Sequence, residues 1–137
     1  MAGELILDTG PLVAFLDSCD SGHGVCTGFI SACRRPLVTT DAVVAEAMHL
    51  LRRVPGGQRV CLSLLIEGFA SVCPVSLPSL RRVRALMDKY ADLPMDYADA
   101  TLVVLAEDLG VSDILTLDRR DFGVYRIAGT GAFHILP

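Results

Sequence analysis

Four acidic residues stand where the surrounding sequence can bring them to one site. They are Asp8, Glu46, Asp99 and Asp118. Carboxylate oxygens are hard ligands that suit Mg²⁺ or Mn²⁺ rather than zinc, and the three histidines form no cluster that would offer another ligand set. One or two such cations, ~3.5–4 Å apart when there are two, can activate water for in-line attack on a phosphodiester. These residue types therefore indicate metal-dependent hydrolysis without a covalent protein intermediate.

Asp8 and Asp118 each come directly after a short apolar run that predicts a β-strand. Capping of the turn or helix that follows explains either residue alone as well as chemistry does. In a parallel sheet, however, ligands bind beyond the carboxyl ends of the strands, where both aspartates would lie. Two aspartates at such positions favour a shared site.

Glu46 lies at the edge of the apolar stripe of a predicted helix, three residues after Val43 and four before Leu50. A carboxylate in this position must reach solvent, an arginine or a metal, because burial of an unpaired charge is costly. A salt bridge at the rim of the core is therefore an alternative to a site role for Glu46.

Asp99 heads the inward face of another predicted helix. The apolar residues of this face follow it at three, four and seven positions: Leu102, Val103 and Ala106. A capping box, with Asp96 as the N-cap and Asp99 at the third helical position, is the structural alternative. Both roles are compatible, since the helix dipole favours an acid in the first turn. For Asp96 itself we favour the capping role over a site role.

Short apolar segments alternate with helical patterns along the chain. We expect strands at residues 4–7, 37–39, 70–73 and 113–117, with one or two more at 124–127 and 132–136. We expect helices at residues 12–17, 22–34, 41–54, 58–67, 77–90 and 94–109. The alternation predicts a single three-layer α/β/α domain over residues 1–137, with a mainly parallel central sheet of four to five strands.

The composition argues against a disordered chain and against a membrane-spanning helix. The 137 residues are 52% hydrophobic with a mean hydropathy of +0.49, yet no run approaches the ~20 uncharged apolar residues that a membrane helix needs. The first residues, 1–4, lack the basic start of a signal peptide, so we expect a cytoplasmic protein with no membrane contact. The five cysteines include no Cys-x-x-Cys pair, and we expect them to be small buried residues in a reducing compartment.

The net charge of −4 is unusual for a protein that binds nucleic acid, because phosphate contacts favour basic surfaces. The four acids named above account for all of this charge, and bound divalent cations would reverse the local sign. Net charge therefore does not decide whether RNA is a substrate.

Four short motifs, in this order and at this spacing, resemble those of the PIN-domain family. They are LDTGPL (7–12), VAEA (44–47), LPMDYADATL (93–102) and LTLDRRDF (115–122). Each motif alone is weak, whereas four in the right order are specific. The resemblance covers essentially the whole chain and, within the family, extends to the VapC-type toxin ribonucleases of type II toxin–antitoxin systems.

The resemblance implies an endoribonuclease that hydrolyses RNA phosphodiester bonds with Mg²⁺ or Mn²⁺ as its cofactor. Its acidic quartet, which binds the metal, would be Asp8, Glu46, Asp99 and Asp118. The resemblance also implies a cognate antitoxin protein whose peptide occludes the cleft, and a homodimer.

Supporting residues follow from the same resemblance. Thr116 matches the hydroxyl residue before the last acid, and Asp121 often accompanies Asp118, so we expect both to support the site. The family often has Ser or Asn two positions after the first aspartate, where this chain has Gly10. Water positioning would therefore fall to Thr9 or to backbone groups.

Three alternatives differ in class or in biological role. A phosphotransferase of the haloacid-dehalogenase type needs a second aspartate two residues after its nucleophile, where Gly10 stands. A catalytically inert RNA-binding PIN-like protein would have no need of all four acids. A housekeeping PIN nuclease of RNA processing would share the site, and the absence of an accessory domain favours the toxin over it.

Overall fold

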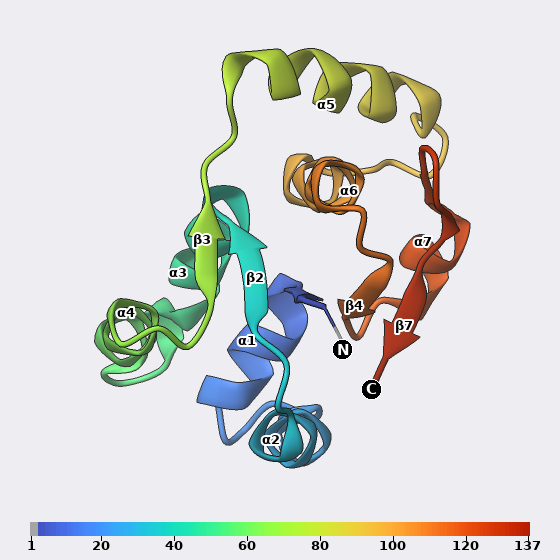
Figure 1. Cartoon of the computed structure of the whole chain (residues 1–137). Coiled ribbons are helices and arrows are strands. Elements are labelled where there is room, and N and C mark those ends of the chain that lie inside the picture. Colours follow the sequence, from blue (N-terminus) through green and yellow to red (C-terminus); the bar gives the residue numbers. More distant parts are fainter. Residues whose placement is uncertain (1–2) are drawn as a thin grey trace.

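A five-stranded, wholly parallel sheet forms the centre of the protein, in the strand order β3-β2-β1-β4-β7 (Figure 1). The structure is a computed structural model that describes residues 3–137. The strands are β1 (Leu5–Leu7), β2 (Leu37–Thr40), β3 (Ser71–Cys73), β4 (Asp113–Leu115) and β7 (His134–Leu136). The predicted α/β fold with a parallel sheet of four to five strands is confirmed.

Helices cover both faces of this sheet. Successive residues of a strand point to opposite faces, and Leu5, Ile6 and Leu7 of the central strand β1 are all fully buried. The helices are α1 (Thr9–Leu16), α2 (His23–Ala32), α3 (Asp41–Leu50), α4 (Gly57–Ile66), α5 (Leu77–Lys89), α6 (Tyr97–Leu109) and α7 (Arg119–Val124). The burial of β1 on both faces is what a three-layer arrangement requires.

Helix α6 is the most deeply buried helix, because every residue from Ala100 to Ala106 lies in the interior. It packs against β2, α3 and α5. A helix that is apolar on nearly all sides is typical of the inside of a domain. Gly110 ends it in the left-handed conformation, at φ 65°, as expected for a glycine at this position. The first turn of α6, which carries Asp99, is therefore held by a rigid element.

Several element boundaries differ from the prediction. The helix predicted over residues 41–54 ends at Leu50 and continues as a 3₁₀ turn, Leu51–Arg53, which tightens the chain before the Pro-Gly-Gly segment. The helix predicted from residue 94 begins at Tyr97, because Asp96 has extended backbone and caps it. The sequence allows either Thr40 or Asp41 as the cap of α3, and the structure has Thr40 in this role.

The region after β4 differs most from the predicted arrangement of strands and helices. The strand predicted over residues 113–117 ends at Leu115, and helix α7 follows at Arg119–Val124, where no helix was predicted. The predicted terminal strands divide into an antiparallel pair, β5 (Arg126–Ile127) with β6 (Gly131–Ala132), and strand β7, which joins the main sheet. Six residues with a charged start carry too little periodicity for a sequence pattern to reveal α7.

The cysteines are unpaired, and the prediction that all are buried is wrong for Cys19, which is exposed in the loop after α1. Cys26 and Cys61 are buried in helices α2 and α4, and the other two are half-buried. Within residues 3–137, no helix has the length and apolar character needed to span a bilayer. Residues 1 and 2, which belong to the segment judged to lack a signal peptide and to the predicted domain 1–137, lie outside the described residues.

Candidate active site

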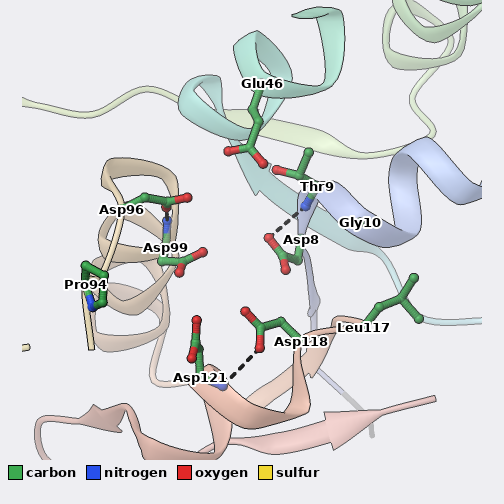
Figure 2. A pocket seen from close by; sticks show the side chains of 10 residues that line it. All are labelled: Asp8, Thr9, Gly10, Glu46, Pro94, Asp96, Asp99, Leu117, Asp118 and Asp121. Atoms are coloured by element: carbon green, nitrogen blue, oxygen red, sulfur yellow. Dashed lines mark hydrogen bonds between the residues drawn. The ribbon is translucent and has the colours of Figure 1, made fainter. Parts of the chain in front are cut away.

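An acidic cavity of about 490 Å³ opens beyond the carboxyl ends of β1 and β4 (Figure 2). Its lining consists of Asp8, Thr9, Gly10, Glu46, Pro94, Asp96, Asp99, Leu117, Asp118 and Asp121. All four acids of the predicted quartet are among them, together with two further aspartates. The six carboxylates, called the six site acids below, are Asp8, Glu46, Asp96, Asp99, Asp118 and Asp121.

Asp8 follows β1 directly and serves as the N-cap of α1. One carboxylate oxygen accepts a hydrogen bond from the Thr9 backbone N–H at 2.8 Å, and the other accepts one from the Thr116 hydroxyl at 2.7 Å. Burial raises the pKa of Asp8 to about 6, and the charges of Glu46 and Asp118 add to the rise, although both hydrogen bonds oppose it. The sequence left capping and a site role as alternatives for Asp8. In the structure Asp8 caps α1 and also lines the cavity.

Thr116 links the two strand-end aspartates. Its buried hydroxyl donates to Asp8 Oδ2 and accepts from the Asp118 backbone N–H at 3.0 Å. Because one hydroxyl serves both residues, the positions of the two acids depend on each other. The predicted supporting residue therefore lies behind the cavity wall, in contact with the acids that line it.

Asp118 and Asp121 both belong to the start of α7. Asp118 is the N-cap, and its Oδ1 accepts a hydrogen bond from the Asp121 backbone N–H at 3.0 Å. Oxygens of Asp99, Asp118 and Asp121 all lie within 4.8 Å of one another. Asp121, expected in a supporting position, thus belongs to the same group of three carboxylates as Asp99 and Asp118.

Asp99 lies in the first turn of α6, with its backbone N–H bonded to Asp96 Oδ1 at 2.8 Å. This bond confirms Asp96 as the cap of the helix, although the Asp96 side chain also lines the cavity. Burial raises the pKa of Asp99 far above its usual range, and the charges of Asp96 and Asp8 raise it further. The surroundings of Asp99 therefore disfavour its ionised form unless a cation is near.

Tyr125 is a contact of Asp99 that the sequence did not reveal. Its hydroxyl donates to Asp99 Oδ2 at 2.8 Å. Burial, together with the charge of Asp99, raises the pKa of this phenol well above its ordinary value, so it remains a donor. A tyrosine among apolar neighbours in the sequence usually lies in the core. No local pattern predicts a hydrogen bond to a residue 26 positions away.

Glu46 reaches the cavity from α3, on the side where Thr9 lies (Figure 2). Burial raises its pKa, as does the charge of Asp96, while the nearby Thr9 hydroxyl opposes the rise. Thr9 Oγ1 is itself buried and makes no hydrogen bond of ordinary geometry in the described part of the chain. An unpartnered hydroxyl beside a carboxylate is a place where a water or a ligand atom would be bound.

The donor set of the cavity fits a divalent cation. Within residues 3–137 none of the six site acids forms an ion pair, so the salt bridge considered for Glu46 is not found there. Burial raises the pKa of Asp8 and that of Asp99, and the charges of neighbouring acids raise both further, so a bound cation would favour the ionised carboxylates. Hard oxygen donors of this kind suit Mg²⁺ or Mn²⁺.

The class of this protein is defined by its parallel sheet, by the helices that cover the sheet, and by the acidic cavity at the strand ends. The PIN domain family model matches residues 5–129, and the chain belongs to that family. It is similar to Ribonuclease VapC26 of Mycobacterium tuberculosis, with 31% identity over 135 residues that cover 97% of this chain and 100% of that protein.

Solved structures show the same fold at low sequence identity. The toxin VapC20 of Mycobacterium tuberculosis, described as cleaving the sarcin–ricin loop, superposes with a TM-score of 0.78 at 16% identity, over 85% of this chain and 91% of that one. A toxin–antitoxin complex from Klebsiella pneumoniae gives 0.67 at 16% identity, covering 97% and 96%. VapBC2 from Rickettsia felis, bound to a promoter DNA fragment, gives 0.68 at 9% identity, covering 98% and 99%.

Proposed function

We propose that this protein is a divalent-metal-dependent endoribonuclease that hydrolyses RNA phosphodiester bonds. The observation that carries the proposal is the cavity with six site acids and no ion pair to them in the described residues. Membership of the PIN domain family and the full-length relative named as a ribonuclease support RNA as the substrate.

The residues divide into ligands and supports. Asp99, Asp118 and Asp121 would hold a Mg²⁺ or Mn²⁺ ion, with Asp8 and Glu46 facing the same space. When bound, such a cation lowers the pKa of water and stabilises negative charge on the leaving oxygen. The chain's own groups set the geometry, because Thr116 holds Asp8 in place and the α7 backbone holds Asp118.

Thr9 would bind the attacking water or a phosphate oxygen. Its hydroxyl is buried beside Glu46 and lacks a regular partner within residues 3–137, so it has a donor to offer. Gly10 next to it contributes no side chain. This assigns to Thr9 the water-positioning role that a Ser or Asn two positions after the first aspartate would otherwise fill.

The biological role we propose is that of the toxin of a toxin–antitoxin pair, acting in the cytoplasm as a homodimer and as a single domain. The relative named VapC26 and the fold shared with structures of toxin–antitoxin complexes support an antitoxin partner. Two observations test this role. A small antitoxin gene next to this one, and a complex of the two products on co-expression, would support it. A protein that processes RNA without such a neighbour would be the housekeeping nuclease instead.

RNA cleavage mapped with Mg²⁺, with Mn²⁺ and with EDTA tests the activity. We expect cuts that require metal and that disappear in Asp8→Asn. The matched control is Asp88→Asn, which makes the same change at an exposed position on α5 and should cut as the unaltered protein does. Metal-dependent cleavage that persists undiminished in Asp8→Asn, or cleavage unaffected by EDTA, would refute the proposal. The positions of the cuts made by the unaltered protein would identify the RNA target class.

A further inference from the structure

Tyr125 lies outside the cavity lining, yet it connects the acids that line it. Its ring is fully buried and makes edge contacts with Phe122, at 5.1 Å between ring centroids, and with Tyr90, also at 5.1 Å. Phe133 extends this aromatic cluster on the far side of Phe122. The ring therefore has little freedom to move, and the direction of its hydroxyl is set by the packing around it.

The position of Tyr125 on α7 gives that hydroxyl a particular target. Asp118 caps the start of helix α7, Asp121 lies in its first turn, and Tyr125 follows its last residue, with a backbone N–H that donates to the Asp121 carbonyl at 3.1 Å. The hydroxyl donates to Oδ2 of Asp99, which belongs to α6. One short helix thus supplies two acids of the three-carboxylate group and also holds the third.

The bond occupies one Asp99 oxygen and leaves the other open. Within the described residues Oδ2 accepts from Tyr125, whereas Oδ1 has no hydrogen-bond donor. A carboxylate held through one oxygen presents the other in a defined direction. Outer partners that orient a metal-binding carboxylate in this way affect the affinity for the metal, although they do not touch it.

We propose that Tyr125 is a positioning residue of the metal site, whose hydroxyl orients Asp99 so that its free oxygen faces the oxygens of Asp118 and Asp121. The inference rests on the proposed function, since it assumes that these acids bind a cation. It deepens that function by assigning a role in metal affinity to a residue that neither the motifs nor the cavity lining contains.

Tyr90 shows what a merely structural hydroxyl looks like in the same cluster. Its ring packs edge-on against Tyr125, and its hydroxyl accepts a hydrogen bond from the Arg126 backbone N–H at 2.9 Å. Both tyrosines are buried, and both hydroxyls have one protein partner. Only the partner differs, a site acid in one case and a backbone amide in the other. Tyr90→Phe is therefore a matched control for Tyr125→Phe.

The experiment measures Mn²⁺ binding to the full chain by isothermal titration calorimetry, for the unaltered protein, Tyr125→Phe and Tyr90→Phe. We expect Tyr125→Phe to weaken Mn²⁺ binding by roughly 10–100-fold, and Tyr90→Phe to leave it nearly unchanged. RNA cleavage should show a matching shift. The Mn²⁺ concentration for half-maximal rate should rise in Tyr125→Phe, while the rate at saturating Mn²⁺ should largely recover.

Each other outcome is decisive. Equal Mn²⁺ affinity in the unaltered protein and in Tyr125→Phe overturns the inference and leaves the proposed function standing. A lower rate at every Mn²⁺ concentration, with an unchanged half-saturation point, also overturns it, because loss of folded protein alone produces that pattern. An unaltered protein that neither binds Mn²⁺ nor cleaves RNA overturns both proposals together.

Discussion

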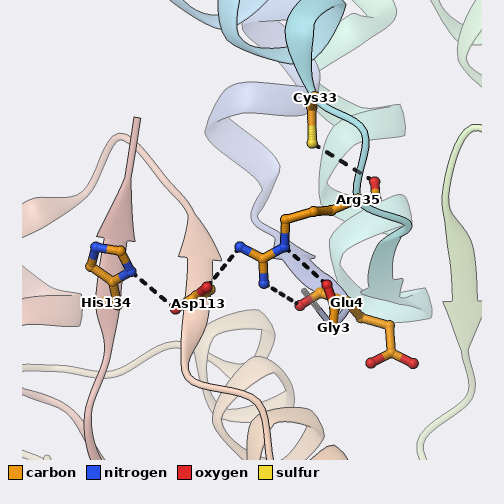
Figure 3. Close-up of polar contacts among 6 residues, drawn as sticks. All are labelled: Gly3, Glu4, Cys33, Arg35, Asp113 and His134. Atoms are coloured by element: carbon orange, nitrogen blue, oxygen red, sulfur yellow. Dashed lines mark hydrogen bonds and ion pairs between the residues drawn. The ribbon is translucent and has the colours of Figure 1, made fainter. Parts of the chain in front are cut away.

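The two ends of the central sheet treat their acidic residues in opposite ways. At the amino ends of the strands, Asp113 pairs with Arg35 at 2.7 Å and with His134 at 3.0 Å (Figure 3). Burial alone would raise the pKa of Asp113, but the hydrogen bonds and charges of Arg35 and His134 outweigh it and hold the pKa below its usual range. The same arginine donates to the backbone carbonyls of Gly3 and Glu4, so it connects β4 to the start of β1.

At the carboxyl ends, the chain supplies no such cation within the described residues. Burial raises the pKa of Asp8 to about 6 and that of Asp99 well above its usual range. Strand β4 begins at Asp113 and leads to Asp118 three residues after its last residue, so one strand connects both environments. The comparison teaches that an acid paired with a cation of its own protein stabilises the fold, whereas a group of acids without a charged partner destabilises it until a cation binds, as we propose for this site.

Asparagine in place of aspartate at the two ends should have opposite effects, and this is the largest difference we predict. Asp99→Asn should reduce RNA cleavage by roughly 1,000-fold or more. This exceeds the roughly 10–100-fold effect of removing a residue that only orients a metal ligand. It should also raise the melting temperature in EDTA at neutral pH, because it removes a carboxyl that is ionised in the unfolded chain but whose burial favours the protonated form in the folded protein. Initial rates and thermal melts measure the two effects.

Asp113→Asn is the counterpart at the other end. It should lower the melting temperature, because Arg35 loses its charged partner, and it should leave cleavage intact at temperatures where the protein is folded. If both variants shift stability in the same direction, the contrast between the two ends is wrong.

The second prediction concerns pH, through the raised pKa of Asp8. Below pH ~4 this carboxyl is protonated in both the folded and the unfolded chain. As the pH rises from 3.8 to about 6, the unfolded chain ionises first, and above about 6 the folded protein carries the charge at a cost. Without metal, the free energy of unfolding should therefore fall through this window, by about 3 kcal/mol from Asp8 alone.

Mn²⁺ should reverse this dependence, because it binds the ionised carboxylates. Melting curves at pH 5 and at pH 7.5, each with EDTA and with Mn²⁺, measure the effect. We expect a large stabilisation by Mn²⁺ at pH 7.5 and a small one at pH 5. Equal stabilisation at both pH values would show that protons and metal do not compete for these groups.

The third prediction tests the amino end. Arg35→Met should lower the free energy of unfolding by about 2 kcal/mol, because it leaves Asp113 and two backbone carbonyls without their charged donor. Mn²⁺ affinity should stay the same. Arg34→Met, at the exposed neighbouring position, is the control and should change stability little. A loss of Mn²⁺ affinity in Arg35→Met would mean that the two ends are coupled.

The smallest effect is predicted for Asp96, which has both a structural role and a place at the site. Its side chain caps α6 and also lines the cavity. Asp96→Ala should cost about 1 kcal/mol of stability through the lost cap, as urea unfolding would show, with most of the cleavage activity retained. Loss of activity at an unchanged stability would instead assign Asp96 to the metal ligands.

Much of the fold could be predicted because it is encoded locally. The strand-forming runs and the cap at Asp96 depend on neighbouring residues, and both are found in the structure. Boundaries were less predictable where two local signals compete. Helix α7 was missed because six residues hold less than two turns of pattern, and the aspartate at its start is equally typical of a turn.

The sequence by itself determined the alternating architecture, and it predicted the four acids of the quartet and the strands and helices that carry them. Only the tertiary structure decided that these acids surround one cavity, that Asp121 joins Asp99 and Asp118 in one group of carboxylates, and that Tyr125 bonds to Asp99. The physical reason is distance along the chain. Thr116 bonds to Asp8 across 108 positions, and such a contact depends on strand order and on side-chain packing, which no local pattern of residue types contains.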